Sequence, residues 1–298
     1  MGVIQWFPGH MAKARRILSE NLSNVDVVVE LCDARIPYSS RNPEIVKVIG
    51  NKPSVLVFNK VDLADPVLCD FWRNYYKEQG IETVFTDSRK GNGVKQVTAA
   101  IRKAMEPKLQ RQAEKGRMNA QLRAMIVGVP NVGKSSFINR VAGKAVAVTA
   151  DKPGVTRSKQ WLKMDSDIYL LDTPGLLWPK IEDQRCGYRL ACTGAIKDDI
   201  LDNIDIACFL LEFLLETYPQ ALRERFKISE DLSGLERVEL LEHCGRKRGC
   251  LVKGGEVDLS RAATIVLDEF RGGKMGRISL DTEKALEPVK MPDEEQES

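Results

Sequence analysis

One short run constrains this chain more than any other: GVPNVGKS at residues 128–135. An apolar run, AMIV at residues 124–127, precedes it, and a helix-like run, SFINRV at residues 136–141, follows it. A strand, a glycine-framed loop that ends in Lys-Ser, and a helix together predict a phosphate-binding P-loop. Its glycines let backbone N–H groups turn toward phosphate oxygens, and the helix N-terminus is electropositive. We therefore expect a nucleotide-binding protein.

The side chains of this loop have separate predicted roles. Lys134 would reach the β- and γ-phosphates, and the hydroxyl of Ser135 would bind Mg²⁺. Backbone groups on both sides of these two residues would complete the phosphate cradle. The predicted nucleotide-binding residues of the loop are Asn131, Val132, Gly133, Lys134, Ser135 and Ser136.

A second motif, NKVD at residues 59–62, follows an apolar run at residues 54–58 and indicates that the base is guanine. The Asp62 carboxylate can accept hydrogen bonds from the N1–H and the 2-amino group of guanine. Adenine has an acceptor at N1 and no 2-amino group, so it would leave Asp62 unpaired. Asn59 would brace the loop, and the aliphatic stem of Lys60 would cover the base.

A third strand-like run is followed by TDSRK at residues 86–90. This loop occupies the place of the Ser-Ala-Lys loop that offers a backbone N–H to guanine O6, although Arg89 stands where alanine is usual. We therefore include Ser88 and Arg89 among the candidate nucleotide-binding residues. An ordinary polar loop between a strand and a helix remains the alternative.

Two segments after the P-loop have the features of nucleotide-sensing switches. Thr156, in the polar run DKPGVTR at residues 151–157, is the candidate second hydroxyl for Mg²⁺, held while the γ-phosphate is present. The run DTPG at residues 172–175 follows a strand-like segment. We expect Asp172 to hold Mg²⁺ through water and the Gly175 N–H to meet the γ-phosphate.

Composition sets limits on location and partners. The 45 basic and 42 acidic residues leave a formal net charge of +3, which does not by itself indicate a nucleic-acid partner. Seven cysteines without a Cys-x-x-Cys pair are typical of reduced thiols. The sequence has no apolar run of membrane-spanning length and no signal-peptide pattern at its start. We expect a cytoplasmic protein without a membrane partner.

The pattern of apolar residues predicts an α/β fold followed by a helical part. Strands are expected at residues 25–32, 54–58, 81–85, 124–127, 145–148, 160–164 and 168–171, and helices at 11–22, 43–49, 66–78, 93–105, 187–201, 204–218, 234–244 and 259–270. We predict a doubly wound, mostly parallel sheet in a GTPase domain at residues 1–179, a helical domain at 180–285 and a disordered acidic tail at 286–298.

The order of the motifs is rotated. In an ordinary small GTPase the P-loop comes before the base-reading motifs, whereas here residues 59–62 and 86–90 come first. A doubly wound sheet tolerates such circular permutation when a linker joins the original termini, and the basic segment 106–123 would be that linker. The helical domain then follows directly on the second switch. We expect GTP and GDP to position it differently.

Six motifs in this order resemble the YlqF/RbgA family of circularly permuted GTPases, known as ribosome biogenesis GTPase A. They are WFPGHM at residues 6–11, DARIP at 33–37, NKVD at 59–62, GVPNVGKSS at 128–136, PGVT at 153–156 and DTPG at 172–175. The resemblance implies a GTPase that assists assembly of the large (50S) ribosomal subunit. It also implies binding to rRNA or a pre-ribosomal particle in the GTP state, partly through the helical domain, and release on hydrolysis.

The catalytic water lacks its usual partner. Many GTPases carry glutamine directly after Asp-x-x-Gly, and here Leu176 stands in that place. The resemblance implies that His10 serves instead, and histidine is chemically suited because its unperturbed pKa is near ~6.5. A structural role for this histidine remains the alternative. The resemblance also makes Asn131 a candidate ligand for K⁺, which would substitute for an arginine finger.

Two alternatives remain beside a GTPase that assembles the large subunit. The chain could be a GTP-gated RNA-binding switch with negligible hydrolysis, a hypothesis that Leu176 favours. It could also be a GTPase of the same family that acts on another ribonucleoprotein. GTP and GDP are expected ligands in every case, and no DNA partner is expected. The basic residues of the helical domain could contact phosphates or could form an ordinary solvated surface.

Overall fold

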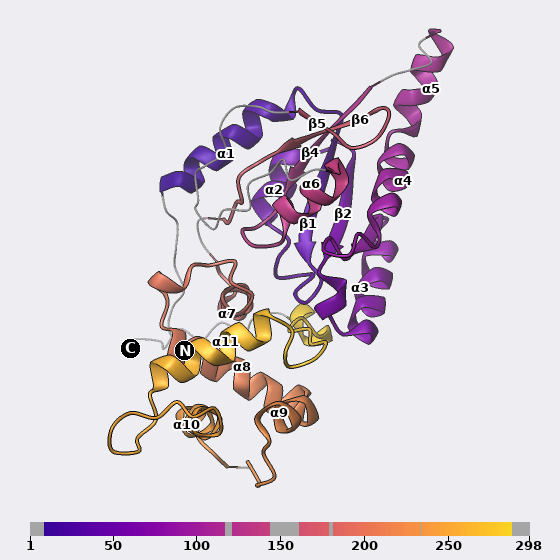
Figure 1. Cartoon of the computed structure of the whole chain (residues 1–298). Helices are drawn as coiled ribbons and strands as arrows, with labels where there is room; N and C mark the ends of the chain where they lie inside the picture. Colours follow the sequence, from indigo (N-terminus) through magenta and orange to yellow (C-terminus); the bar gives the residue numbers. More distant parts are fainter. Residues whose placement is uncertain (1–8, 117–120, 144–160, 179–180, 233, 288–298) are drawn as a thin grey trace, which may run out of the picture.

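A six-stranded sheet forms the centre of the computed structural model, which describes residues 9–116, 121–143, 161–178, 181–232 and 234–287 (Figure 1). The strand order is β3-β2-β1-β4-β6-β5. Every pairing is parallel except that of β5, which runs antiparallel to β6 at the edge. The strands are β1 (Val27–Asp33), β2 (Ser54–Asn59), β3 (Thr83–Thr86), β4 (Leu122–Val127), β5 (Trp161–Lys163) and β6 (Ile168–Asp172).

Burial on both faces explains the composition of the central strands. Every residue of β1 is buried, as expected for a parallel strand with neighbours on both sides and helices over both faces. The register pairs Val29 with Val55 of β2 and with Ile126 of β4, so β-branched residues stack across the middle of the sheet. The predicted α/β fold with a mostly parallel sheet is confirmed.

Helices cover both faces of the sheet. Side chains alternate along β2: Val55 and Val57 pack in the larger core with α4, whereas Leu56 and Phe58 pack in a second cluster with Trp72 of α3. Helix α6 contacts β6. The helices of this part are α1 (Gly9–Leu22), α2 (Pro43–Ile49), η1 (Val61–Leu63), α3 (Pro66–Glu78), α4 (Val94–Ala104), α5 (Glu106–Glu114) and α6 (Lys134–Ala142).

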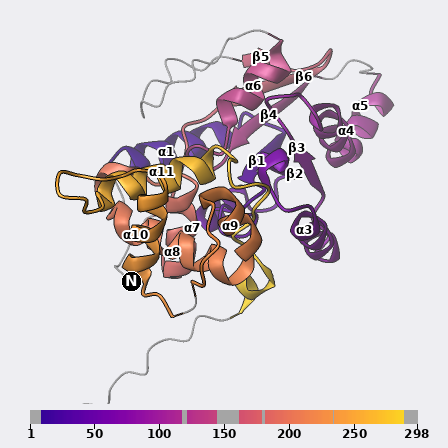
Figure 2. The ribbon, with the colours of Figure 1, turned by 60° about the horizontal axis from the view of Figure 1, so that its bottom comes forward.

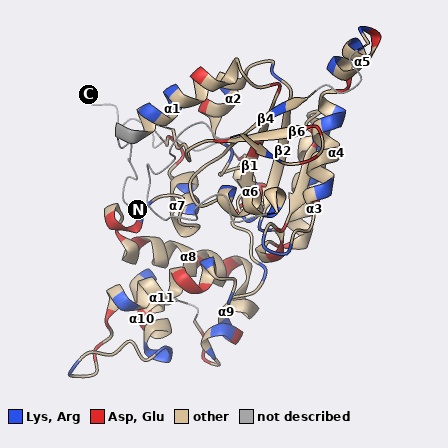
Figure 3. Ribbon diagram, turned by 45° about the horizontal axis from the view of Figure 1, so that its top comes forward, with Lys and Arg blue, Asp and Glu red and all other residues tan. Residues whose placement is uncertain are grey.

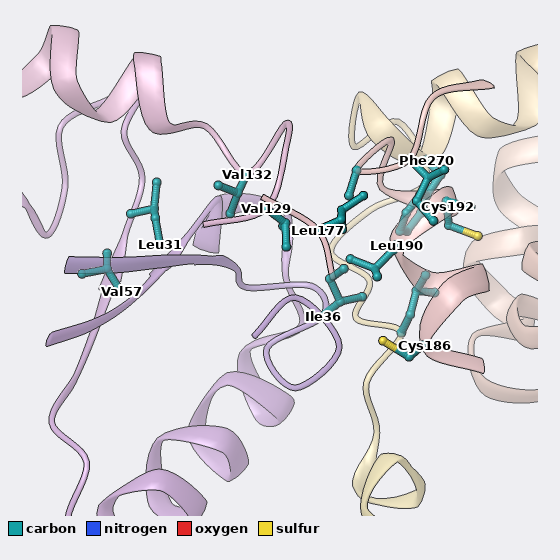
Figure 4. Close-up of a cluster of buried hydrophobic side chains, with 14 of the residues drawn as sticks. Leu31, Ile36, Val57, Val129, Val132, Leu177, Cys186, Leu190, Cys192 and Phe270 are labelled. Atoms are coloured by element: carbon teal, nitrogen blue, oxygen red, sulfur yellow. The ribbon is translucent and has the colours of Figure 1, made fainter. Parts of the chain in front are cut away.

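A cluster of helices lies below the sheet in Figure 1 and in the rotated view of Figure 2. It comprises α7 (Gln184–Cys192), η2 (Asp198–Ile200), α8 (Asn203–Thr217), α9 (Pro219–Phe226), α10 (Arg237–Lys247) and α11 (Leu259–Arg271), with η3 (Glu283–Leu286) near the end of the chain. Figure 4 shows apolar side chains continuing from the sheet into this cluster, from Val57 and Val132 to Leu190 and Phe270. The two parts therefore share a buried core.

The helices of the second part differ from prediction in three places. The helix expected at residues 187–201 ends at Cys192, because the chain turns at Gly194 with a φ of 76°. Helix α9 begins at Pro219, directly after α8, although the sequence pattern predicts no helix there. The helix expected at residues 234–244 is α10, which begins and ends three residues later. The strand expected at 145–148 and the residues from 288 onward lie outside the described residues. The domain boundary at residue 179 stays a prediction.

Two further observations concern the lengths of the helices and the state of the cysteines. No helix in the described ranges is both long and apolar enough to cross a membrane. All seven cysteines are free thiols and all are buried. The prediction that they remain unpaired is confirmed.

Candidate functional site

The sheet brings the predicted motifs to one edge. Parallel strands β1, β2, β3, β4 and β6 end there, and the loops that follow them carry the DARIP, NKVD, TDSRK, P-loop and DTPG motifs. In open α/β sheets ligands bind outside the carboxyl ends of the strands. The base-reading motifs and the P-loop, which are far apart in the sequence, therefore face a common site.

The P-loop has the conformation that its sequence predicts. Helix α6 begins at Lys134, directly after Gly133, whose φ is 97°. The Lys134 ammonium is buried and donates to the carbonyl oxygens of Gly128 at 3.0 Å and Val129 at 2.8 Å. Burial lowers the pKa of Lys134 to about 8, and the carboxylate of Asp172 opposes part of that shift. A phosphate would stabilise the charged form of this lysine.

Asn59 joins the NKVD loop to the P-loop. Its side-chain amide donates to the Val132 carbonyl at 3.0 Å, and its Oδ1 accepts from the hydroxyl of Ser88 at 2.6 Å. A Cβ at Gly133 would lie 2.4 Å from Asn59 Nδ2, which explains why glycine occupies that position. The predicted bracing role of Asn59 agrees with this geometry, since one buried amide holds three loops together.

Lys60 makes the second link between the two motifs. Its ammonium donates to the Asn131 carbonyl of the P-loop at 2.7 Å and pairs with the Asp33 carboxylate at 2.9 Å. Asp33 also receives two hydrogen bonds from the Arg35 guanidinium, at 2.9 and 2.8 Å. Burial opposes ionisation of Asp33, but Arg35 and Lys60 together hold its pKa well below the usual range. Asp33 is therefore a buried anion that orients Lys60.

The other residues predicted to contact the base differ in whether their hydrogen-bonding groups are already used within the protein. The half-buried Asp62 carboxylate makes no hydrogen bond or ion pair with a described residue, so it is available to a base. The backbone N–H of Ser88 donates to Asn59, and that of Arg89 donates to Asp87 Oδ1 at 3.0 Å. Both N–H groups are thus used within the protein, and Ser88 acts here as a partner of Asn59.

Arg140 of α6 holds the same loop from the P-loop side. Its guanidinium donates to the Ser88 carbonyl at 3.2 Å and also to the Arg89 carbonyl. The helix that begins at the P-loop therefore reaches the loop after β3. A single basic residue in a helix gives no such signal in the sequence, so this contact could not be predicted from the pattern alone.

The DTPG segment lies against the P-loop. Asp172 ends β6, and its Oδ1 is buried without a hydrogen-bond partner among the described residues. Burial raises the pKa of Asp172, and the nearby Lys134 ammonium lowers it in part. Gly175 packs next to Pro130 and Lys134. The unpaired carboxylate oxygen of Asp172 and the hydroxyl of Ser135 are oxygen ligands of the kind that Mg²⁺ prefers.

The residues after Gly175 carry no polar side chain toward this site. Leu176, Leu177 and Trp178 are all buried. The backbone of Leu176 is held on both sides, since its N–H donates to Gly128 at 3.2 Å and its carbonyl accepts from Asn42 at 2.8 Å. The segment is therefore packed as part of the core and cannot hold a water in the way that glutamine would.

Asn131 connects the P-loop to the helical cluster. Its backbone is left-handed, with φ of 56°, and its side chain is exposed. The amide Nδ2 donates to the carbonyl of Gly194, in the turn after α7, at 2.6 Å. The candidate K⁺ ligand thus contacts the segment that follows the second switch. Its Oδ1 makes no hydrogen bond with a described residue.

Two predicted site residues cannot be placed. Thr156 lies outside the described residues. His10 belongs to the first turn of α1, but its side chain is outside the described part of the structure. The structure does bring together Asn59, Lys60, Asp62, Ser88, Asn131, Val132, Gly133, Lys134, Ser135, Ser136, Asp172 and Gly175 at the carboxyl edge of the sheet.

Asp33 is the functional residue to which the sequence analysis gave no role. The sequence shows it only as the first residue of the DARIP motif, a charged residue at the end of a mostly apolar strand. In the structure it is buried and supports Lys60. A carboxylate at the end of a parallel strand can be recognised as a candidate, but its partner can be identified only from the fold.

Comparisons with known proteins agree with this site. The family model described as 50S ribosome-binding GTPase matches residues 123–239. A ribosome biogenesis GTPase A from Priestia megaterium is 50% identical over 279 residues, which cover 93% of this chain and 96% of that protein. A counterpart of the same name from Bacillus cereus is 48% identical over 280 residues, with 94% of each chain covered.

A solved structure is also similar over nearly the whole length. The crystal structure of GNP-bound YlqF from T. maritima has a TM-score of 0.62 and 28% sequence identity, and the match covers 90% of this chain and 97% of that chain. At this coverage the match includes residues of both the sheet and the helical cluster. This chain belongs to the ribosome biogenesis GTPase A family, and it is a GTPase.

Proposed function

We propose that this chain binds GTP and GDP at the P-loop, hydrolyses GTP, and acts as an assembly factor for the large (50S) ribosomal subunit. The name of its relatives, ribosome biogenesis GTPase A, and the description of the matching family model, 50S ribosome-binding GTPase, support the ribosomal target. In this proposal the GTP-bound protein binds rRNA or a pre-ribosomal particle in the cytoplasm. Hydrolysis of GTP then releases the protein from the particle.

One observation carries the nucleotide part of the proposal. The NKVD loop is bonded to the P-loop twice, from Asn59 to Val132 at 3.0 Å and from Lys60 to Asn131 at 2.7 Å. A base on Asp62 and phosphates on Lys134 therefore belong to one rigid site. The rotated order of motifs does not separate them, because the sheet restores their positions.

A magnesium ion fits the residues at the phosphate end. Ser135 and Asp172 would hold it, with Asp172 acting through water, and Thr156 is the proposed further ligand. Bound there, Mg²⁺ would neutralise charge on the phosphate oxygens during hydrolysis. The unpaired Oδ1 of Asp172 supports this assignment. The Gly175 N–H is proposed to meet the γ-phosphate, next to Lys134.

Hydrolysis by the isolated protein is expected to be slow. Leu176 is buried and its backbone is fixed, so no side chain directly after Gly175 orients a water. We propose His10 as the residue that does so, from the first turn of α1. Asn131 is the proposed ligand for K⁺, which would add positive charge near the phosphates. Turnover in K⁺ should then exceed turnover in Na⁺ at equal ionic strength.

The helical cluster at residues 180–285 is the proposed RNA-binding domain. Along the helices of this cluster, Lys and Arg positions lie among Asp and Glu positions (Figure 3). Several basic residues have internal partners, as Lys247 does with Glu230 and Arg248 with Glu269. Exposed basic residues remain for contacts with phosphates: Arg246, Lys253, Arg261 and Lys274.

The test is GTP hydrolysis in K⁺ buffer with and without purified large ribosomal subunits. Stimulation of tenfold or more is expected, because the particle would complete a site without glutamine. Small subunits and free RNA serve as matched controls and should stimulate less. A burst of phosphate that equals the amount of enzyme would indicate that product release, and not hydrolysis, limits turnover.

Three other results would change the conclusion. Tight GTP binding without hydrolysis under any condition would indicate a GTP-gated RNA-binding switch. Stronger stimulation by the small subunit or by another ribonucleoprotein would reassign the target. ATP turnover equal to GTP turnover would contradict the role of Asp62.

A further inference from the structure

The segment that carries Asp62 is short and is held mainly from outside. Lys60 has a left-handed backbone, with φ of 64°, and η1 contains three residues, Val61–Leu63. Two backbone bonds close this turn internally, from Leu63 to Lys60 at 2.9 Å and from Ala64 to Val61 at 3.3 Å. So short a helix leaves most of its carbonyl groups without internal partners.

The partners of these groups come from the end of the chain. Residues 272–281, which we call the C-terminal strap, run past η1. Arg277 donates through Nη2 to the Val61 carbonyl at 3.1 Å and through Nε to the Ala64 carbonyl at 2.8 Å. The Ile278 N–H donates to the Leu63 carbonyl at 3.0 Å. Asp62 therefore lies between two residues whose carbonyls are fixed by the strap.

The next residues extend the contact to the start of α3. The hydroxyl of Ser279 accepts from the Asp65 N–H at 3.0 Å. Asp65 is also the N-cap of α3, and its Oδ2 accepts from the Tyr218 hydroxyl at 3.0 Å. Three consecutive strap residues thus make four hydrogen bonds to the backbone of residues 61–65.

The backbone of the strap also lies close to the Leu63 side chain of η1. Gly273 has a φ of 71°, and a Cβ there would lie 2.5 Å from Leu63 Cδ2. A larger residue at that position would require the Leu63 side chain to move, and the left-handed backbone would disfavour any side chain there. The path of the strap is therefore adapted to the position of the base-reading segment.

Both ends of the strap are anchored. Arg271, directly before it, forms a two-bond ion pair with Asp198 at 2.7 and 2.8 Å. At the other end, fully buried Asp281 accepts from the Tyr38 and Ser39 N–H groups, both at 2.7 Å, and pairs with Arg189. A strap fixed at both ends can hold η1 in place rather than follow its motion.

We propose that the C-terminal strap is a specificity element of the nucleotide site, in which Arg277 is a positioning residue for Asp62. The proposal rests on the function proposed above, in which Asp62 reads guanine. Arg277 touches no base itself. It fixes the carbonyls on both sides of Asp62, so that the carboxylate can accept from the N1–H and the 2-amino group at the same time.

The test compares GDP with IDP, whose hypoxanthine base retains the N1–H but lacks the 2-amino group. A displaced Asp62 weakens two hydrogen bonds to GDP but only one to IDP. Since each bond is worth about fivefold in affinity, Arg277→Ala should lower the GDP-to-IDP preference of the full chain by about fivefold. Affinities are measured by calorimetry, and circular dichroism of the nucleotide-free protein checks the fold.

Two matched variants sharpen the result. Lys274→Ala removes an exposed basic side chain from the same strap and should leave the preference unchanged. Arg277→Lys can bond to only one of the two carbonyls and should give an intermediate preference. This milder variant also decides the question if Arg277→Ala does not fold.

The possible outcomes distinguish a failure of the role of Arg277 from a failure of the proposed guanine recognition by Asp62. Equal weakening of GDP and IDP by Arg277→Ala, or no weakening, would overturn the role of Arg277. Asp62→Asn is the reference variant and should abolish the preference for GDP. If Asp62→Asn instead keeps the wild-type preference, the assignment of Asp62 as the guanine reader fails, and the inference fails with it.

Discussion

Glu30 makes the stability of this protein depend on pH in a defined direction. It lies in the middle of β1, opposite Val127 of the P-loop strand, and its side chain is 6% exposed. Arg41 is its ion-pair partner, at 3.4 Å, and the second carboxylate oxygen, Oε1, has no partner among the described residues. Burial raises the pKa of Glu30 from 4.5 to about 7, although Arg41 opposes the shift.

The magnitude follows from linkage between protonation and folding. A carboxyl whose pKa is higher in the folded state than in the unfolded state stabilises the fold when it is protonated. For Glu30 this stabilisation is complete below pH ~4.5 and is lost as the pH rises through about 7. The difference between the two pKa values corresponds to roughly 3 kcal/mol.

The assay is denaturant unfolding of the nucleotide-free chain and of Glu30→Gln between pH 5 and 8.5. The free energy of unfolding of the wild type, taken relative to the variant, should fall by roughly 3 kcal/mol across this range. All other groups titrate in both proteins and cancel in the difference. A difference that stays constant with pH, at equal denaturant slopes, would refute the reasoning.

Three further substitutions test separate parts of the structure. Gly133→Ala should weaken GDP binding about tenfold or more, because its Cβ would meet Asn59; Gly80→Ala has a similar φ but open space and should bind normally. Leu176→Gln should lower stability by about 1–3 kcal/mol without faster GTP hydrolysis, since position 176 faces the core. A tenfold faster turnover would contradict that orientation. Arg271→Ala should lower the free energy of unfolding by roughly 2–3 kcal/mol, measured with denaturant, because it removes a partly exposed ion pair to Asp198 of η2 and two hydrogen bonds to the carbonyls of Ala191 and Cys192. A loss below about 1 kcal/mol would show that solvent already screens the pair.

Much of the fold could be predicted because the signals were local. The buried strands VVVELCD and SVLVFN are apolar runs bounded by polar loops, and the P-loop helix begins where its glycine and lysine predict. Each of these patterns depends on neighbours within a few residues. The errors occurred where local signals compete, as at Gly194, where a turn ends a helix that the apolar spacing would have continued.

The sequence motifs predict which residues form the candidate site, but they do not predict which residues those side chains contact. The sequence identifies Asn59, Lys60 and Lys134 by their neighbours in the chain. It does not show that Lys60 pairs with Asp33, or that Arg140 holds the loop of Ser88. These pairs are separated by 27 and 52 positions, and they meet only because the sheet order places their loops side by side.

The helical cluster contacts the nucleotide site at both ends, and this follows from the rotated chain. The strap makes four hydrogen bonds to the backbone around Asp62, and Gly194 accepts one from Asn131 of the P-loop. A fragment cut after residue 179 would lose all five bonds, although it would keep every recognised motif. Affinity and base preference measured on such a fragment would therefore describe a different site. The proposed guanine-reading role of Asp62 would therefore depend on the whole chain, because the residues that hold the backbone around Asp62 come from its far end.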